Sequence, residues 1–147
     1  ITGVDLVREQ ITVAHGERLT LRQDKIRFEG HAIECRINAE DPHSHVPSPG
    51  HISTYHPPGG PGVRIDSALY AGYKVPPHYD SMIAKLIIHD TERSRALGRM
   101  GRSLGECVIE GIKTNVPLHR AVLRAPDMLS GHYDTGWLAR FLTTWEN

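Results

Sequence analysis

The sequence predicts an α+β fold, a small antiparallel β-barrel or sandwich-like domain with an N-terminal helix and packed C-terminal helices. Three observations indicate this fold. Apolar residues recur at helical spacing over residues 4–15, short alternating segments separated by proline and glycine clusters follow from Leu19 to about His89, and helical stripes return after Thr91. A chain of 147 residues is long enough to bury one hydrophobic core.

The N-terminal helix is expected over residues 4–15. Thr2 and Asp5 match a capping box, and Gly16 can end the helix. The apolar stripe is narrow, so we expect this helix to lie on a surface that the sequence does not contain. The stripe consists of Val4, Val7, Ile11 and Ala14. The chain begins with Ile1 rather than Met, which suggests a piece cut from the middle of a longer protein.

Short strands are expected through the middle of the chain. The proline- and glycine-rich stretches 46–50 and 56–62 cannot be strand interiors, so they mark turns. The doubled glycines of the second stretch could approach a phosphate, but no lysine or strand-to-helix transition follows them in the P-loop arrangement, so we interpret the stretch as a β-turn loop. The expected strands are 19–21, 26–28, 31–40, 51–55, 63–70 and 82–89.

Three helices are expected after the strands. Thr91 can cap the first, whose apolar stripe runs to Gly111. Asn115 can cap the second, which Pro126 ends, and Asp134 can cap the third. The inward positions are Leu97, Met100, Leu104, Cys107 and Val108 in the first, Leu118, Ala121, Val122 and Ala125 in the second, and Trp137, Leu138, Phe141 and Leu142 in the third.

The strand at 31–40 has one unusually polar face. Side chains alternate along a strand, so one face is small and apolar while the other gathers a guanidinium, two carboxylates and an amide. The polar face can be a solvated edge kept soluble by alternating charges, or a functional site built around the guanidinium. The apolar face consists of Ile33, Cys35, Ile37 and Ala39, and the polar face of Glu34, Arg36, Asn38 and Glu40.

Composition excludes several classes of function. Lys plus Arg and Asp plus Glu each number 17, so the formal net charge is zero and neither nucleic acid nor an anionic membrane is expected as the main partner. The sequence has no apolar run of membrane-spanning length and no signal-peptide pattern. Cys35 and Cys107 stand among apolar residues, which favours reduced, unreactive core thiols of a cytoplasmic protein over a disulfide.

Two further polar groups have competing interpretations. Four of the 10 histidines crowd one loop region, but they lie in proline-rich segments without a ligand-spacing motif, so we expect a surface loop and no metal site. At 76–86, Asp80 can be incidental at a proline-led strand start, or it can orient a cation, with Arg36 as the candidate. The four histidines are His43, His45, His51 and His56.

Four motifs together resemble one family. They are HAIECRINAEDP at 31–42, PSPG at 47–50, HPPGGPGVRIDSALYAGYKVPPHYDSMIAKL at 56–86 and EGIKTN at 110–115. The combination resembles the C-terminal domain of biotin carboxylase, and it covers essentially the whole chain. The PSPG form and compact spacing are most similar to the subunit of bacterial acetyl-CoA carboxylase, while related domains occur in propionyl-CoA and pyruvate carboxylases.

The resemblance implies a ligase. In the family, this domain closes one side of an active site whose other side is an ATP-grasp domain of the same chain. ATP, with Mg or Mn, and bicarbonate form carboxyphosphate, which releases carbon dioxide. Biotin on the biotin carboxyl carrier protein is then deprotonated and attacks the carbon dioxide, and a carboxyltransferase uses the product for fatty acid synthesis. A cytoplasmic homodimer is implied for the full-length enzyme.

The resemblance also implies roles for individual residues. Arg36, the arginine of the ECR motif, faces the biotin ureido oxygen, where negative charge develops. Thr135, in YDTGWL, matches a nucleotide contact. Arg64 matches a position at the homodimer interface, and Pro61 replaces an aromatic residue of some relatives, which leaves the packing of that interface open. Our own inference from the residues adds four supporting groups around Arg36, namely Glu34, Asn38, Glu40 and Asp80.

The family's ATP-binding lysines, magnesium-binding glutamates and RxxxEH segment are not found in this sequence and are expected upstream of it. We therefore expect residues 1–18 to be the tail of an ATP-grasp domain and residues 19–147 to be the biotin carboxylase C-terminal domain. This piece should fold but neither bind the cofactors nor carboxylate biotin alone. The alternatives are a non-catalytic β-barrel module for docking or dimerisation, and the same domain of a propionyl-CoA or pyruvate carboxylase.

Overall fold

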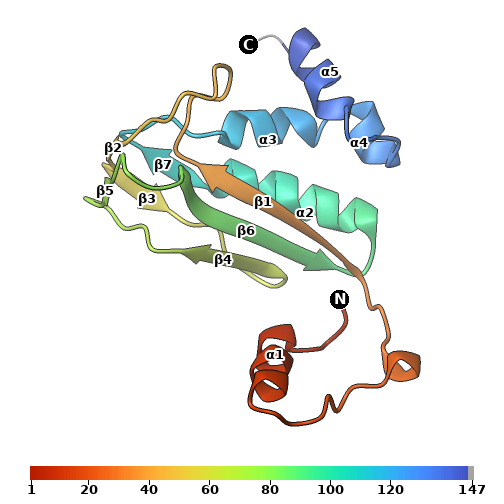
Figure 1. Ribbon diagram of the computed structural model, residues 1–147. Coiled ribbons are helices and arrows are strands. Elements are labelled where there is room, and N and C mark those ends of the chain that lie inside the picture. Colours follow the sequence, from red (N-terminus) through yellow and green to blue (C-terminus); the bar gives the residue numbers. More distant parts are fainter. Residues whose placement is uncertain (146–147) are drawn as a thin grey trace.

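A three-stranded antiparallel sheet, in the order β1-β6-β4, lies at the centre of the computed structural model, which describes residues 1–145 (Figure 1). The α+β class is confirmed, and the strands of residues 1–145 form three separate sheets rather than a closed barrel. The main sheet consists of β1 (His31–Asn38), β6 (Met82–Asp90) and β4 (Val63–Ser67). The smaller sheets pair β2 (Gly50–His51) with β5 (Lys74–Val75), and β3 (Thr54–His56) with β7 (Val108–Glu110).

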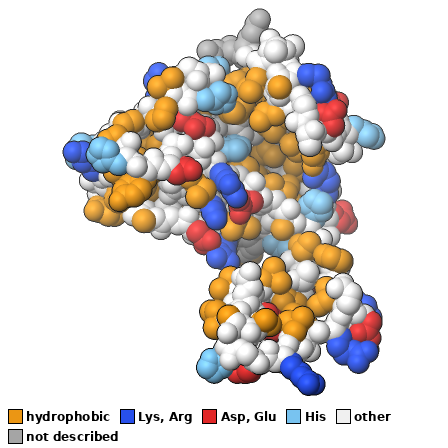
Figure 2. Space-filling model, in the orientation of Figure 1, with side chains coloured by type: hydrophobic (Ala, Val, Ile, Leu, Met, Phe, Trp, Pro, Cys, Tyr) orange, Lys and Arg blue, Asp and Glu red, His pale blue; other side chains and the backbone are white. Residues whose placement is uncertain are grey.

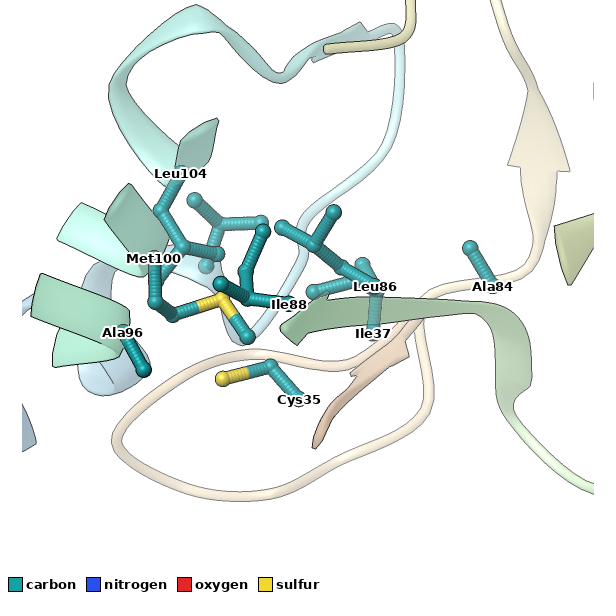
Figure 3. Packing of buried hydrophobic residues seen from close by; sticks show 9 residues of the cluster. Cys35, Ile37, Ala84, Leu86, Ile88, Ala96, Met100 and Leu104 are labelled. Atoms are coloured by element: carbon teal, nitrogen blue, oxygen red, sulfur yellow. The ribbon is translucent and has the colours of Figure 1, made fainter. Parts of the chain in front are cut away.

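The hydrophobic core lies against one face of the main sheet. Alternation along β1 turns Cys35 and Ile37 into this core and leaves Glu34 and Arg36 on the opposite face, as expected. Helix α2 (Arg93–Glu106) packs over the inner face and supplies the other wall. The buried side chains that meet there include Cys35, Ile37, Ala84, Leu86, Ile88, Ala96, Met100 and Leu104 (Figure 3).

Helix α2 starts and ends differently from the prediction. Its N-cap position is Glu92, which makes no capping hydrogen bond, so the predicted Thr91 cap is wrong. The Thr91 N–H instead donates to the Asp90 carboxylate at 2.7 Å. The helix ends at Glu106 and not near Gly111, because residues 108–110 leave the helical path and pair with β3. Apolar spacing alone cannot reveal such a distant strand partner.

The C-terminal part contains three short helices. Pro126 begins the middle helix, where proline is well tolerated in the first turn. The cap predicted at Asp134 is wrong, because the cap position of the last helix is Gly136, whose N–H donates to the Asp134 carboxylate. The three helices are α3 (Val116–Val122), α4 (Pro126–Ser130) and α5 (Trp137–Thr144). Within residues 1–145, no helix combines the length and hydrophobicity that crossing a membrane requires.

The strand predicted at 51–55 is interrupted. β2 ends at His51 and β3 begins at Thr54. Between them, Ile52 is buried and its N–H donates to the Tyr73 carbonyl. Gly111 lies against this interruption with φ 95°, and a Cβ there would collide with the carbonyl of His51. The strand predicted at 63–70 likewise ends early, at Ser67.

The N-terminal part forms a separate lobe below the main sheet (Figures 1 and 2). Helix α1 (Leu6–Ala14) is confirmed, although Asp5 rather than Thr2 caps it, with its carboxylate accepting from the Arg8 N–H at 3.0 Å. None of the helix residues is buried, and Figure 2 shows hydrophobic side chains exposed over the lobe.

The strands predicted at 19–21 and 26–28 are wrong. Residues 1–30 contain no strand, and a short 3-10 helix, η1 (Gln23–Lys25), lies between the two segments. Leu19, Leu21 and Ile26 instead line a hollow of about 250 Å³ together with residues at the start of the chain, whereas Phe28 is exposed. The hollow is lined by Thr2, Val4, Leu6, Leu19, Leu21, Arg22, Gln23 and Ile26.

Candidate functional site

The outward face of β1 carries an ion pair at its centre. Glu34 and Arg36 are two residues apart and therefore lie on the same side of the strand. Arg36 Nε donates to Glu34 Oε1 at 3.2 Å, while 69% of the Arg36 side chain stays exposed. Figure 2 shows basic and acidic side chains together over the middle of β1 and β6. The guanidinium is thus oriented by a carboxylate and still open to a ligand.

The same sheet face continues to β4. In the strand register, Lys85 of β6 lies opposite Arg36 on one side and opposite Asp66 on the other. Asp66 accepts two hydrogen bonds of 2.8 Å from Arg64, which lower the pKa of Asp66 and raise the pKa of Arg64. The predicted interface residue Arg64 therefore shares an exposed face with Arg36. Pro61 is exposed in the turn before β4.

A second polar cluster lies at the end of β1. Asn38 Nδ2 and Ser81 Oγ donate to Glu40 Oε2 at 3.3 and 3.2 Å. His45 Nδ1 lies 4.0 Å from the other carboxylate oxygen. Asn38 and Glu40 therefore contact each other, because residues two apart in an extended chain point to the same side. In the described part of the chain, neither makes a hydrogen bond with the Arg36 side chain.

Asp80 lies outside both clusters. Its side chain is exposed, and Oδ1 accepts from the Met82 N–H at 2.8 Å, just where β6 begins. Among residues 1–145, Arg36 pairs with Glu34 and forms no ion pair with Asp80, so the structure does not support the interpretation in which Asp80 orients Arg36. The reason is the strand register, which places Lys85 rather than the residues before β6 opposite Arg36.

The main chain of Arg36 is held by the beginning of α3. Asn115 Nδ2 and His119 Nε2 contact the Arg36 carbonyl oxygen at 3.1 and 2.8 Å. Burial lowers the pKa of His119, although the bond to Arg36 and the charge of Glu40 oppose that change. The sequence pattern indicates a helix cap at Asn115 and does not single out His119. Their four-residue spacing, which places both on one side of a helix, is the signal that could have found them.

A hollow of about 290 Å³ adjoins Glu34, between β1 and helices α2 to α4. The residues that line it include Glu34, Arg93 and Tyr133. Arg93 donates to the Met128 carbonyl at 2.6 Å, and its guanidinium carbon lies 5.8 Å from the centre of the Tyr133 ring. Thr135, the predicted nucleotide contact, is exposed in the turn before α5, close in sequence to this wall.

The cysteines and loop histidines offer no second reactive centre in the described residues. Burial raises the pKa of the Cys35 thiol to about 12 and also raises that of Cys107. Among the loop histidines, His43 stacks its ring on Trp145 at 4.3 Å. Residues 1–145 contain no group of three or more His, Cys, Asp or Glu side chains placed to hold a metal ion.

Comparisons with known proteins agree with one another. The family model described as the biotin carboxylase C-terminal domain matches residues 34–140. The chain is 53% identical over 139 residues to the biotin carboxylase of Nostoc sp., covering 94% of this chain and 31% of that protein. It is 50% identical over 142 residues to a pyruvate carboxylase subunit of Methanothermobacter thermautotrophicus, covering 96% of this chain and 29% of that protein.

A solved structure has the same fold. It is the biotin carboxylase domain dimer of the Hydrogenobacter thermophilus 2-oxoglutarate carboxylase, in complex with MgADP, ADP and bicarbonate. The TM-score is 0.92 at 43% sequence identity, and the alignment covers 100% of this chain and 33% of that chain. The chain thus spans about a third of the length of the relatives that it matches.

Proposed function

Since the chain belongs to the biotin carboxylase C-terminal domain family, we propose that it forms the biotin-facing side of an ATP-dependent biotin carboxylase active site. The observation that carries this proposal is the placement of Arg36. Its guanidinium is exposed on the outward face of β1, while its main chain is held by Asn115 and His119. A cation fixed in this way stabilises negative charge that develops on a reacting oxygen.

The chemistry of arginine suits this role. Biotin supplies a ureido group whose oxygen gains negative charge when the neighbouring nitrogen loses its proton. The hydrogen bond from the Arg36 guanidinium to Glu34 uses Nε, and residues 1–145 provide no other partner for this side chain. Its two terminal nitrogens can therefore both face a ligand oxygen. The planar, permanently charged fork also explains why Lys would be a poor replacement.

We infer that the nucleotide and its metal are held largely by the part of the full-length protein that this chain lacks. The described residues do not fit a metal site, and the chain covers about a third of its relatives. ATP, with Mg or Mn, would activate bicarbonate there. Thr135 and the neighbouring hollow are the proposed nucleotide-facing surface of this chain. We expect the isolated chain to be inactive, and ATP- and bicarbonate-dependent carboxylation of free biotin by it would contradict this.

The proposed setting is the first half-reaction of a cytoplasmic acetyl-CoA carboxylase in fatty acid synthesis. The carrier protein would present biotin to Arg36, a carboxyltransferase would take the product, and a homodimer would form through the Arg64 surface. The PSPG form of residues 47–50 supports this choice. The 50% identity to a pyruvate carboxylase subunit favours the same domain in a different carboxylase as the alternative. Residues 1–18 are proposed as the tail of the ATP-grasp domain and residues 19–147 as this domain.

The test is the Arg36→Ala substitution in the full-length carboxylase. We expect the kcat for carboxylation of free biotin to fall roughly 100-fold or more, as for loss of an oxyanion-stabilising donor. The melting temperature should change little because the side chain is exposed. Turnover is followed by ATP- and bicarbonate-dependent formation of carboxybiotin.

The matched control is Arg102→Ala. Arg102 is also an exposed arginine, and it pairs with a glutamate, Glu106, at the same 3.2 Å. It lies on α2, away from the outward sheet face, so its removal should leave turnover unchanged. Normal turnover of the Arg36→Ala enzyme would favour the remaining alternative, a non-catalytic dimerisation module centred on the exposed Arg64–Asp66 pair.

A further inference from the structure

β1 is an edge strand, and the residues that lead into α3 lie along its unpaired edge (Figure 1). Alternate residues of an edge strand direct their N–H and C=O groups away from the sheet. At Arg36 and Asn38 these groups meet Asn115. Its Nδ2 donates to the Arg36 carbonyl at 3.1 Å, and its Oδ1 accepts from the Asn38 N–H at 2.9 Å. The Asn115 N–H also donates to the Asn38 carbonyl at 3.2 Å. Asn115 therefore pairs with β1 much as a neighbouring strand would.

Because of this pairing, the Asn115 side chain does not cap α3. An asparagine at a helix N-cap normally accepts a hydrogen bond from an N–H of the first turn. Asn115 occupies the N-cap position of α3, yet its side chain makes no such bond. The residue is buried, with 5% of its surface exposed, and both ends of its amide are used on β1. Asn115 thus occupies the position of a helix cap, but its side-chain hydrogen bonds are made with β1.

His119 adds a second donor to the same carbonyl. It lies one helical turn after Asn115, and its Nε2 is 2.8 Å from the Arg36 oxygen. A carbonyl oxygen can only accept, so Nε2 must carry the ring proton. The Arg36 carbonyl oxygen thus accepts two side-chain hydrogen bonds, one from Asn115 at the start of α3 and one from His119 one turn later. These bonds act together with the pairing of Arg36 with Lys85 in the sheet.

Asn115 and His119, which we call the clamp, contact β1 next to an irregularity of the sheet ladder. Ile37 lies opposite Ala84, but Asn38 lies opposite Met82, so β6 has one extra residue at this point. Such a bulge changes the local twist and can redirect the neighbouring side chains. Arg36 itself is still in register opposite Lys85, so the contacts of Asn115 and His119 hold β1 just before the bulge.

We infer that Asn115 and His119 are positioning residues that set the direction of the Arg36 guanidinium by holding its carbonyl oxygen. The inference rests on the function proposed above for Arg36. Neither residue hydrogen-bonds the guanidinium, so both act through the main chain. Displacement of a reacting group by about 1 Å can cost 100-fold in rate, so a distant clamp of this kind can affect catalysis strongly.

The experiment removes the two donors separately in the full-length carboxylase. His119→Leu has no donor, and Asn115→Asp keeps the acceptor for the Asn38 N–H while it places an oxygen against the Arg36 carbonyl. We expect each to lower the kcat for free biotin roughly tenfold, with the KM for ATP unchanged. His119→Gln retains an N–H donor and should restore at least half of the activity.

A double-mutant cycle with Arg36→Ala distinguishes positioning from general damage. If His119 acts through Arg36, His119→Leu should cause no further loss in the Arg36→Ala background. The control is Leu118→Ala in the same helix, a buried apolar position outside the core beneath β1. It should lower the melting temperature without changing the kcat of the folded enzyme.

Three outcomes would overturn the inference. The first is an equal loss from His119→Leu in both backgrounds, and the second is a loss that only follows the folded fraction, as in Leu118→Ala. The third is normal turnover of both clamp variants. All three leave the proposed function intact as long as Arg36→Ala is inactive. Normal turnover of Arg36→Ala itself would instead refute the proposed function.

Discussion

The inner and outer faces of the main sheet are built from alternate residues of the same strands, but they differ in burial and in charge. On the inner face, Leu86 and Ile88 are fully buried against α2. On the outer face, the side chains of Arg36 and Asp66 are charged and exposed, and they are paired with residues of their own strands. Burial on one side fixes the backbone, so the other side can carry charge without having to stabilise the fold. Substitutions on the two faces should therefore affect different measurements.

The largest effect is expected from Leu86→Ala on the inner face. Leu86 has 0% of its surface exposed, and its truncation would leave a cavity under the centre of the sheet. We expect a loss of about 2–5 kcal/mol in the free energy of unfolding, measured by urea denaturation of the full-length enzyme. The kcat of the folded enzyme should be nearly unchanged. A Leu86→Ala enzyme with normal stability but low turnover would contradict the expectation that the inner face determines stability and the outer face determines turnover.

An intermediate effect is expected from Glu34→Gln on the outer face. Gln preserves the shape but removes the charge that orients the Arg36 Nε at 3.2 Å. The kcat for biotin should fall several-fold, whereas the free energy of unfolding should change by less than about 0.5 kcal/mol, as for most surface positions. Steady-state kinetics and urea denaturation of the same sample test both parts. A stability loss comparable to that of Leu86→Ala would contradict the comparison.

The smallest effect is expected from Asp66→Asn, farther along the outer face. The hydrogen bond from Arg64 lowers the pKa of Asp66 below 3.8, so the pair stabilises the fold above that pH and is lost as the pH falls through the folded-state pKa. The pair is exposed, so this contribution is strongly screened. Melting curves should be nearly identical for both proteins at pH 7 and should differ even less at pH 3. A clear destabilisation at pH 7 would show that the outer face does support the fold.

The regular elements could be predicted because their patterns are local. The alternation over 31–40 and 82–89 identified β1 and β6, and the helical stripe after Thr91 identified α2. The errors arose where a distant partner decides the structure. The apolar stripe predicts that the helix continues through residues 108–110, but the pairing of these residues with β3 makes them a strand.

The same limit applies to the candidate site. Glu34 and Arg36 could be placed together because period two puts them on one face. Whether Asp80 meets Arg36 depends on strand register. Asn115 occupies the predicted N-cap position of α3, but its side chain bonds to β1 instead of the helix. Register and main-chain contacts join residues far apart in sequence, and no local pattern encodes them.

The contact between Asn115 and β1 also bears on self-association. Exposed strand edges can recruit strands from other molecules and begin aggregation. At Arg36 and Asn38 the outward groups of β1 are already occupied by Asn115, so a foreign strand cannot add there without displacing it. The opposite edge of the main sheet, β4, carries the exposed charges of Arg64 and Asp66, which disfavour flat strand stacking. One buried amide and one ion pair thus protect the two borders of the sheet in different ways.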